Sequence, residues 1–159
     1  MNIKDCSTLA GIKYLDLSGC YNIDDVSHLK SCHTLILSGC NQVSDVSMLG
    51  GIYNLDISMC EKVTDVSFLR NVTILNLSGC RQVSDISGLS NVHNLNISRC
   101  RKIKDVSGLK NVKILNVKRS NNIVNLHVLQ RDAKDVIVIG TTKIVKQRNT
   151  SKEKHTNYT

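Results

Sequence analysis

The amino-acid sequence predicts a solenoid of short parallel β-strands, and the first observation behind this prediction is a repeat of 20 residues. Asp recurs at positions 5, 25, 45, 65, 85 and 105, Cys at 20, 40, 60, 80 and 100, and Leu at 15, 35, 55, 75, 95 and 115. Columns that stay in phase over this length indicate a repeat architecture. The second observation is the alternation of apolar and polar residues in YLDLS (14–18), which is typical of a strand.

Each turn of the repeat holds one strand and one tighter element. Residues 14–18 predict the strand, and DVSHL (25–29) predicts the tighter element. Asp25 is a natural N-cap, because its carboxylate can accept backbone N–H groups at the start of a turn. A single turn cannot bury its own Leu and Val, so we expect stacked turns with strands about 4.8 Å apart. Twenty residues leave room for a 3₁₀-like turn or loop on the convex side, and not for a full α-helix.

The repeat resembles a known family. IKYLDLSGCYNI (12–23) resembles the leucine-rich repeat pattern L-x-x-L-x-L-x-x-[NC]-x-x-L in its cysteine-containing variant, which is familiar from F-box substrate receptors. The SDVSxL half resembles the internalin type, and similar arrays occur in protozoan parasites and large DNA viruses. The resemblance covers about residues 3 to 140. It implies an α/β-type leucine-rich repeat solenoid with a curved parallel sheet, a fold that binds many unrelated partners.

The end of the chain departs from the repeat. Ser120 stands where Cys is due, and LHVLQRDAKDVIVIG (126–140) fits only with one extra residue before Val136. We therefore expect Val136 and Val138 to point inward in a final strand that Gly140 ends. The predicted domains are a repeat array over residues 1–140, with about six to seven coils, and a basic tail over 141–159. The polar composition of that tail is typical of disorder.

The cysteine column is predicted to be structural. Its side chains should point inward and pack as small hydrophobes with a weak donor. A row of thiols does not converge tetrahedrally, which disfavours the alternative of a metal site. The odd count of 7 Cys and the absence of a signal-peptide pattern favour a reducing compartment, so we expect an intracellular protein, in the host cytoplasm if the chain is viral. No apolar run is long enough to predict a membrane span.

Two polar columns raise the question of chemistry. The Asp column suggests calcium as an alternative to capping, but calcium-binding repeats are glycine-rich and these turns are not. The Ser column (18, 38, 58, 78 and 98) has no His repeatedly placed beside it, so no nucleophilic site is predicted. We expect no catalytic residue, no metal and no cofactor, and therefore a chain that is not an enzyme.

The concave face of the sheet is the predicted binding surface, because its outward columns vary while the core columns do not. Tyr, His and Ile offer contact area there, and Asn offers hydrogen bonds. The residues predicted to contact a partner are Tyr14, Asp16, His33, Ile36, Tyr53, Asp56, Ile74, Asn76, His93, Asn96, Arg99, Arg101, Asn116, Lys118 and Arg119. The alternative is that these are ordinary soluble strand residues.

Charge is distributed unevenly along the chain. Residues 1–80 hold 5 Lys/Arg and 8 Asp/Glu, a net charge of −3, whereas residues 81–159 hold 16 and 5, a net charge of +11. The sequence thus predicts a non-catalytic protein–protein interaction module that binds an acidic protein partner on the concave sheet and the basic C-terminal coils. One alternative is a basic binder of nucleic acid or anionic surfaces, although no aromatic platform interleaves the basic residues. A second is the substrate-recognition part of a ubiquitin-ligase adaptor whose F-box lies on another chain.

Overall fold

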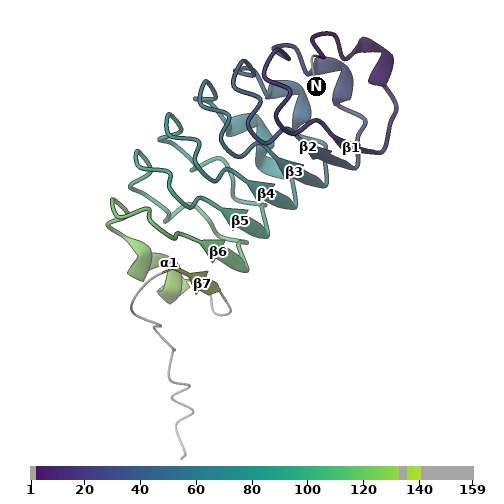
Figure 1. The fold of residues 1–159 in the computed structure, drawn as a ribbon. Helices are drawn as coiled ribbons and strands as arrows, with labels where there is room; N and C mark the ends of the chain where they lie inside the picture. The colour runs from purple at the N-terminus through teal and green to yellow at the C-terminus, as the bar shows by residue number, and fades with distance from the viewer. Residues whose placement is uncertain (1–2, 133–135, 141–159) are drawn as a thin grey trace, which may run out of the picture.

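The computed structural model describes residues 3–132 and 136–140, and these residues form one parallel sheet of 7 strands in sequence order (Figure 1). The strands are β1 (Tyr14–Asp16), β2 (Thr34–Ile36), β3 (Asn54–Asp56), β4 (Ile74–Asn76), β5 (Asn94–Asn96), β6 (Ile114–Asn116) and β7 (Ile137–Ile139). From β1 to β6 each residue pairs with the residue 20 positions later, as Leu35 does with Leu55. The predicted parallel-sheet solenoid with a 20-residue repeat is confirmed.

Short 3₁₀ turns lie opposite the sheet in the first coils. They are η1 (Ser7–Leu9), η2 (Ser27–Leu29), η3 (Ser47–Leu49) and η4 (Ser67–Asn71). The next two coils form turns instead, with Gly88 and Gly108 at the second position of the element. Glycine is a poor helix former and lets the coils approach closely: a Cβ on Gly108 would meet the Ser87 backbone at 3.2 Å. The prediction of 3₁₀-like turns or loops is therefore confirmed: the first four coils have 3₁₀ turns, and the next two have turns without a helix.

The Asp column caps these turns, one position earlier than predicted. The N-cap residue of η2 is Val26, which makes no side-chain cap bond. Asp25 instead accepts the backbone N–H of Ser27 through Oδ1 at 2.8 Å. The same bond to the residue two positions on is made by the Asp residues at positions 5, 45, 65, 85 and 105. The predicted N-cap position is therefore wrong, whereas the predicted acceptance of a backbone N–H by the carboxylate is confirmed, in the form of an Asx turn.

The core is one continuous column of Leu, Ile, Val and Cys side chains. Leu35, Leu55 and Leu115 are fully buried, whereas Leu15 in the first strand is only partly buried. All of the buried apolar residues of the described chain belong to one cluster. Stacking therefore supplies the burial that a single 20-residue coil could not provide.

The last coil corrects the predicted register. Leu115 of β6 pairs with Val138 of β7, a separation of 23 residues, so the coil holds three extra residues and not one. The extra length accommodates an α-helix, α1 (Leu126–Asp132), in place of a 3₁₀ turn. Val138 points inward as predicted, and Val136 packs partly buried against the core before the strand begins. The predicted tail, 141–159, lies outside the described residues.

Candidate functional site

The exposed face of the sheet, called here the sheet face, is built from the two outward positions of each strand. In one column Tyr14, Thr34, Asn54, Ile74, Asn94, Ile114 and Ile137 are register neighbours, and in the other Asp16, Ile36, Asp56, Asn76, Asn96, Asn116 and Ile139. The inward Leu between them is buried in each of strands β2 to β6. The strand pleat thus separates a uniform core from a varied surface, as the sequence predicted.

Three rings beside the N-terminal end of the sheet face form an aromatic row: Tyr14 lies on β1, and His33 and Tyr53 directly precede β2 and β3. The ring of His33 lies between Tyr14 and Tyr53, with centroid distances of 5.6 Å and 4.9 Å, and it stacks on Tyr53 at an interplanar angle of 22°. Tyr14 is 72% exposed and Tyr53 is 47% exposed. A row of rings that pack on each other while facing solvent presents a rigid contact area. His93, predicted to belong to the same surface, is exposed but is separated from the row by Thr73.

The Asp and Asn residues of the second column have a structural role that the sequence analysis missed. Asp16, Asp56, Asn76, Asn96 and Asn116 each accept, through Oδ1, the backbone N–H of the residue two positions on, at 2.7 to 3.1 Å. The bonds from Ser18 lower the pKa of Asp16 below its usual value. These side chains terminate the strands, and only their remaining atoms are available to a partner.

Neighbouring coils are also joined by polar contacts along the sheet face. The Nδ2 of Asn76 donates to Oδ2 of Asp56 at 2.8 Å, and the hydroxyls of Ser78 and Ser98 lie 2.8 Å apart. Ile36 interrupts the capping column and leaves an apolar, half-buried side chain on β2. The predicted adaptable amides are thus partly committed to the fold, while Ile36 and Ile74 are not.

Four basic residues at the C-terminal end form what we call the basic corner: Arg99, Arg101, Lys118 and Arg119. All four are exposed. Within the described residues the one ion pair joins Arg81 and Glu61 at 3.8 Å, so the basic corner has no acidic partner there. Adjacent coils lie about 4.8 Å apart, which leaves these charges close to one another. Like charges at this spacing repel one another.

Two apolar residues extend the sheet face beside the basic corner and were not among the predicted contacts. Ile137 is 60% exposed and Ile139 is 46% exposed, and both lie on β7. They pair with Ile114 and Asn116 of β6. Because the sequence prediction allowed only one extra residue in the last coil, it did not align Ile137 with Ile114 or Ile139 with Asn116. The alternation in VIVIG (136–140) was the pattern that could have revealed them.

The cysteines form a ladder inside the solenoid, and their geometry does not provide a nucleophile. Four thiols donate to a carbonyl of the preceding coil: Cys40 to Leu17 at 3.2 Å, Cys60 to Leu37 at 3.2 Å, Cys80 to Ile57 at 3.0 Å and Cys100 to Leu77 at 3.0 Å. Burial raises the pKa of Cys60 to about 12 and that of Cys40 to about 11. Ser120 continues the ladder with a bond to the Ile97 carbonyl at 2.6 Å. The predicted inward cysteine column is confirmed.

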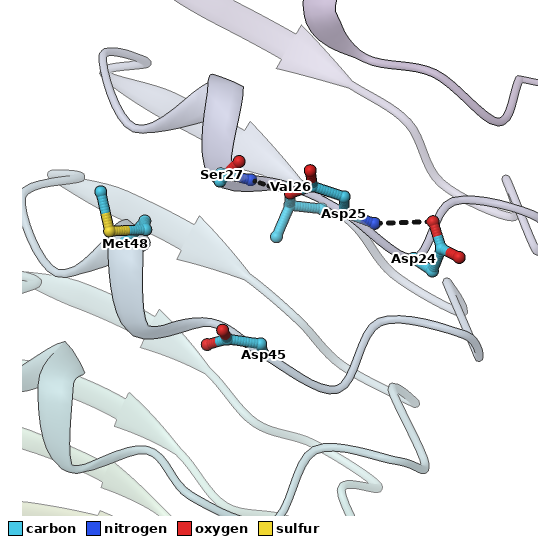
Figure 2. A pocket seen from close by; sticks show the side chains of 6 residues that line it. All are labelled: Asp24, Asp25, Val26, Ser27, Asp45 and Met48. Carbon is cyan, nitrogen blue, oxygen red and sulfur yellow. Dashed lines mark hydrogen bonds between the residues drawn. The ribbon is translucent and has the colours of Figure 1, made fainter.

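The surface opposite the sheet has a hollow beside the Asp column. Figure 2 shows Asp24, Asp25 and Asp45 around it, with Met48 of η3 at its margin. Asp24 accepts the N–H of Asp25 at 2.9 Å, and Asp25 accepts that of Ser27. Each of these carboxylates already accepts a hydrogen bond from a backbone N–H group. Among residues 3–132 and 136–140, no three His, Cys, Asp or Glu side chains come together in a group that could hold a metal ion.

The in-register strands, the 3₁₀ turns and the cysteine ladder define this chain as a leucine-rich repeat solenoid. A chain of the Rad7–Elc1 complex of yeast is similar in structure, with a TM-score of 0.59 and 14% identity over 81% of this chain and 40% of that chain. At this identity the likeness shows the fold alone. No protein-family model and no curated protein matches the sequence.

Two internalins from Listeria monocytogenes are also similar. InlF has a TM-score of 0.48 and 24% identity, and the match covers 69% of this chain and 39% of InlF. Internalin C2 has a TM-score of 0.49 and 26% identity, and the match covers 75% of this chain and 67% of internalin C2. These TM-scores are too low to carry an argument, so the fold assignment rests on the strand ladder and the yeast chain. This chain spans about two fifths of InlF and of the yeast chain. In the described part of the chain, no helix has the length and apolar character needed to cross a membrane.

Proposed function

We propose that this chain is a non-catalytic protein-interaction module that binds a protein partner on its sheet face and basic corner. The observation that carries the proposal is the contrast between the two sides of each strand. The inward positions repeat the same apolar residues, whereas the outer surface carries the exposed aromatic row and the half-buried Ile36 and Ile74. A solvated sheet needs no stacked, exposed rings, and aromatic residues are enriched at protein interfaces.

The chemistry-bearing columns favour this proposal over an enzyme. The thiols are buried donors, the Asp oxygens accept backbone N–H groups, and the Ser hydroxyls pair with each other. The thiols and the Ser hydroxyls are thus engaged between coils, and the Asp carboxylates within a coil. The yeast chain carries the same fold in a protein complex, that of Rad7 with Elc1. Free, buried cysteines also suit a reducing compartment, and we place the protein inside the cell on that ground.

The basic corner favours one second candidate, a binder of nucleic acid or anionic surfaces. The rings of the aromatic row lie on the first three coils, whereas the basic corner lies on the coils of β5 and β6. Base stacking and phosphate contacts would therefore fall at opposite ends of the sheet face. This separation favours a protein partner, and salt titration distinguishes the candidates because counterion release makes nucleic-acid affinity fall steeply.

The experiment begins with proximity labelling in the native cell to identify the partner, followed by calorimetric titration of the purified pair. The test variants are Tyr53→Thr and Ile74→Asn, because Thr73 and Asn94 occupy the same columns in other coils and the fold accepts them. The control is Phe68→His, which places on η4 the residue that η2 has at position 28. We expect the sheet-face variants to weaken binding about tenfold or more and the control to leave it unchanged. Loss of binding in Phe68→His alone would refute the proposed face.

A further inference from the structure

Two arginines of the basic corner are held in a backbone conformation that the array otherwise gives mostly to glycine. Arg99 has a φ of 61° and Arg119 a φ of 63°, and the equivalent positions Gly19, Gly39 and Gly79 have φ between 70° and 75°. A side chain crowds the backbone in this left-handed region, so Arg is strained where Gly is not. Strained residues of this kind concentrate at binding and catalytic sites.

The pair also combines its charges without compensation. Arg99 and Arg119 lie 20 residues apart, in adjacent coils, and the Arg99 N–H donates to the carbonyl of Lys118 at 2.9 Å. Both side chains are exposed, and neither takes part in an ion pair or a side-chain hydrogen bond within the described residues. The free protein therefore bears backbone strain and charge repulsion at the same two positions. Arginine at these two positions is explained if the guanidinium groups bind a ligand, since binding would offset the backbone strain and the charge repulsion.

We propose that Arg99 and Arg119 form a two-armed contact for clustered carboxylates, so that the partner segment bound at this end of the sheet face is an acidic peptide. This inference rests on the proposed function and adds the chemistry of the partner. A guanidinium binds a carboxylate through two parallel N–H bonds, which Lys cannot do. The exposed Ile114, Ile137 and Ile139 on the last two strands offer cover to apolar side chains of a peptide. A phosphodiester backbone has no apolar side chains and would leave these three isoleucines exposed to solvent.

The geometry allows an experiment in which binding and stability change in opposite directions. Arg99→Gly with Arg119→Gly removes both guanidinium groups and restores the glycine of the other coils. The melting temperature should rise by about 2–4 °C per substitution because the backbone strain is relieved. Affinity for the acidic peptide should fall about 10- to 100-fold, since two charge-assisted hydrogen-bonded contacts are lost.

Three variants serve as controls. Met59→Gly alters a corner of the same conformation, with φ of 60°, without changing the charge. Arg70→Gln with Lys110→Gln removes two exposed positive charges away from the basic corner. Arg99→Lys with Arg119→Lys keeps charge and strain but removes the fork. We expect peptide affinity to stay at the wild-type value in the first control, to change less than threefold in the second, and to fall in the third.

The probe is a displayed library of random linear peptides selected on the full chain, with single-stranded DNA as a competitor. The inference is supported if enriched peptides carry clustered Asp or Glu and lose binding to the double glycine variant. It is overturned if the peptides lack acidic residues, if the glycine variant binds them equally, or if the DNA binds more tightly than they do. Peptides lost on Tyr53→Thr alone would sustain the proposed function while refuting the arginine pair. A selection with no enriched peptide would refute the acidic-peptide contact, while the proposed function is decided separately by the calorimetric titration of the native partner.

Discussion

The thiol of Cys60 donates to the carbonyl oxygen of Leu37 at 3.2 Å, across the junction of two coils. That carbonyl belongs to the first residue after the strand β2. Both groups are fully buried. The same carbonyl also accepts the backbone N–H of Cys40 at 3.0 Å, so the thiol is its second donor and adds a hydrogen bond between two coils. The repeat of this contact at 20-residue intervals explains the position of the cysteines.

Replacing Cys60 separates the packing of its side chain from its hydrogen bond. Cys60→Ala should lower the free energy of unfolding by about 1–2 kcal/mol, because it leaves a small cavity and removes one hydrogen bond between the coils. Cys60→Ser should lose less, since Ser120 already makes the equivalent bond at 2.6 Å in the last ladder position. Chemical denaturation followed by circular dichroism measures the difference. If Ser proved as damaging as Ala, the hydrogen bond would have no net value.

The cysteine ladder also predicts alkaline instability. Burial raises the pKa of Cys60 from its usual 9.0 to about 12, so between these values the folded protein keeps a proton that the unfolded chain releases. The stabilisation is therefore complete below pH 9 and is lost as the pH rises from 9 toward 12. The slope is up to about 1.4 kcal/mol per pH unit for each thiol. Urea denaturation across this range should show a smaller loss in Cys60→Ala than in the wild type, and equal losses would contradict the assignment.

The Asp column predicts the opposite dependence in acid. Backbone bonds from the Ser residue two positions on lower the pKa of Asp65 below its usual 3.8. A depressed pKa contributes stability above 3.8 that is lost as the pH falls below it. Asp65→Asn should keep an accepting oxygen, as Asn76 and Asn96 do at the strand ends, and should weaken the dependence on pH. Thermal melts at about pH 7 and pH 3 measure it, and an Asn variant with unchanged acid sensitivity would count against the caps.

The sequence alone predicted the columns of the sheet face because the strand period is two and the coil period is 20. Once Leu35 and Leu55 are inward, Thr34 and Ile36 must be outward. The capping bonds of Asn76 and Asn116 were missed because an amide at a strand end looks the same whether it binds the backbone or a partner. The stacking of His33 on Tyr53 was missed because it depends on side-chain rotamers, which the period does not determine.

The positive φ of Arg99 and Arg119 could have been predicted from the sequence. Their column contains glycine at positions 19, 39 and 79, and a repeated glycine points to a positive φ. The last coil had no such sign. The 20-residue register still holds at Asn125, which accepts the Val106 N–H, and no column repeats after it, so the count of extra residues could not be derived from periodicity.

Gly140 tests the corrected register of β7. It follows the strand with a φ of 97°, and a Cβ built on it would lie 2.5 Å from the Cα and N of Lys118. Because backbone atoms cannot move aside, Gly140→Ala should separate β7 from β6 and lower the free energy of unfolding by roughly 1–3 kcal/mol. Gly11→Ala is the matched control, since its φ is 88° and no atom lies within 4 Å of its Cβ. Hydrogen exchange at Val117, which donates to Ile139 at 2.9 Å, reports the opening directly. If Val117 exchanged at the wild-type rate in Gly140→Ala, β7 would not pair in the register described.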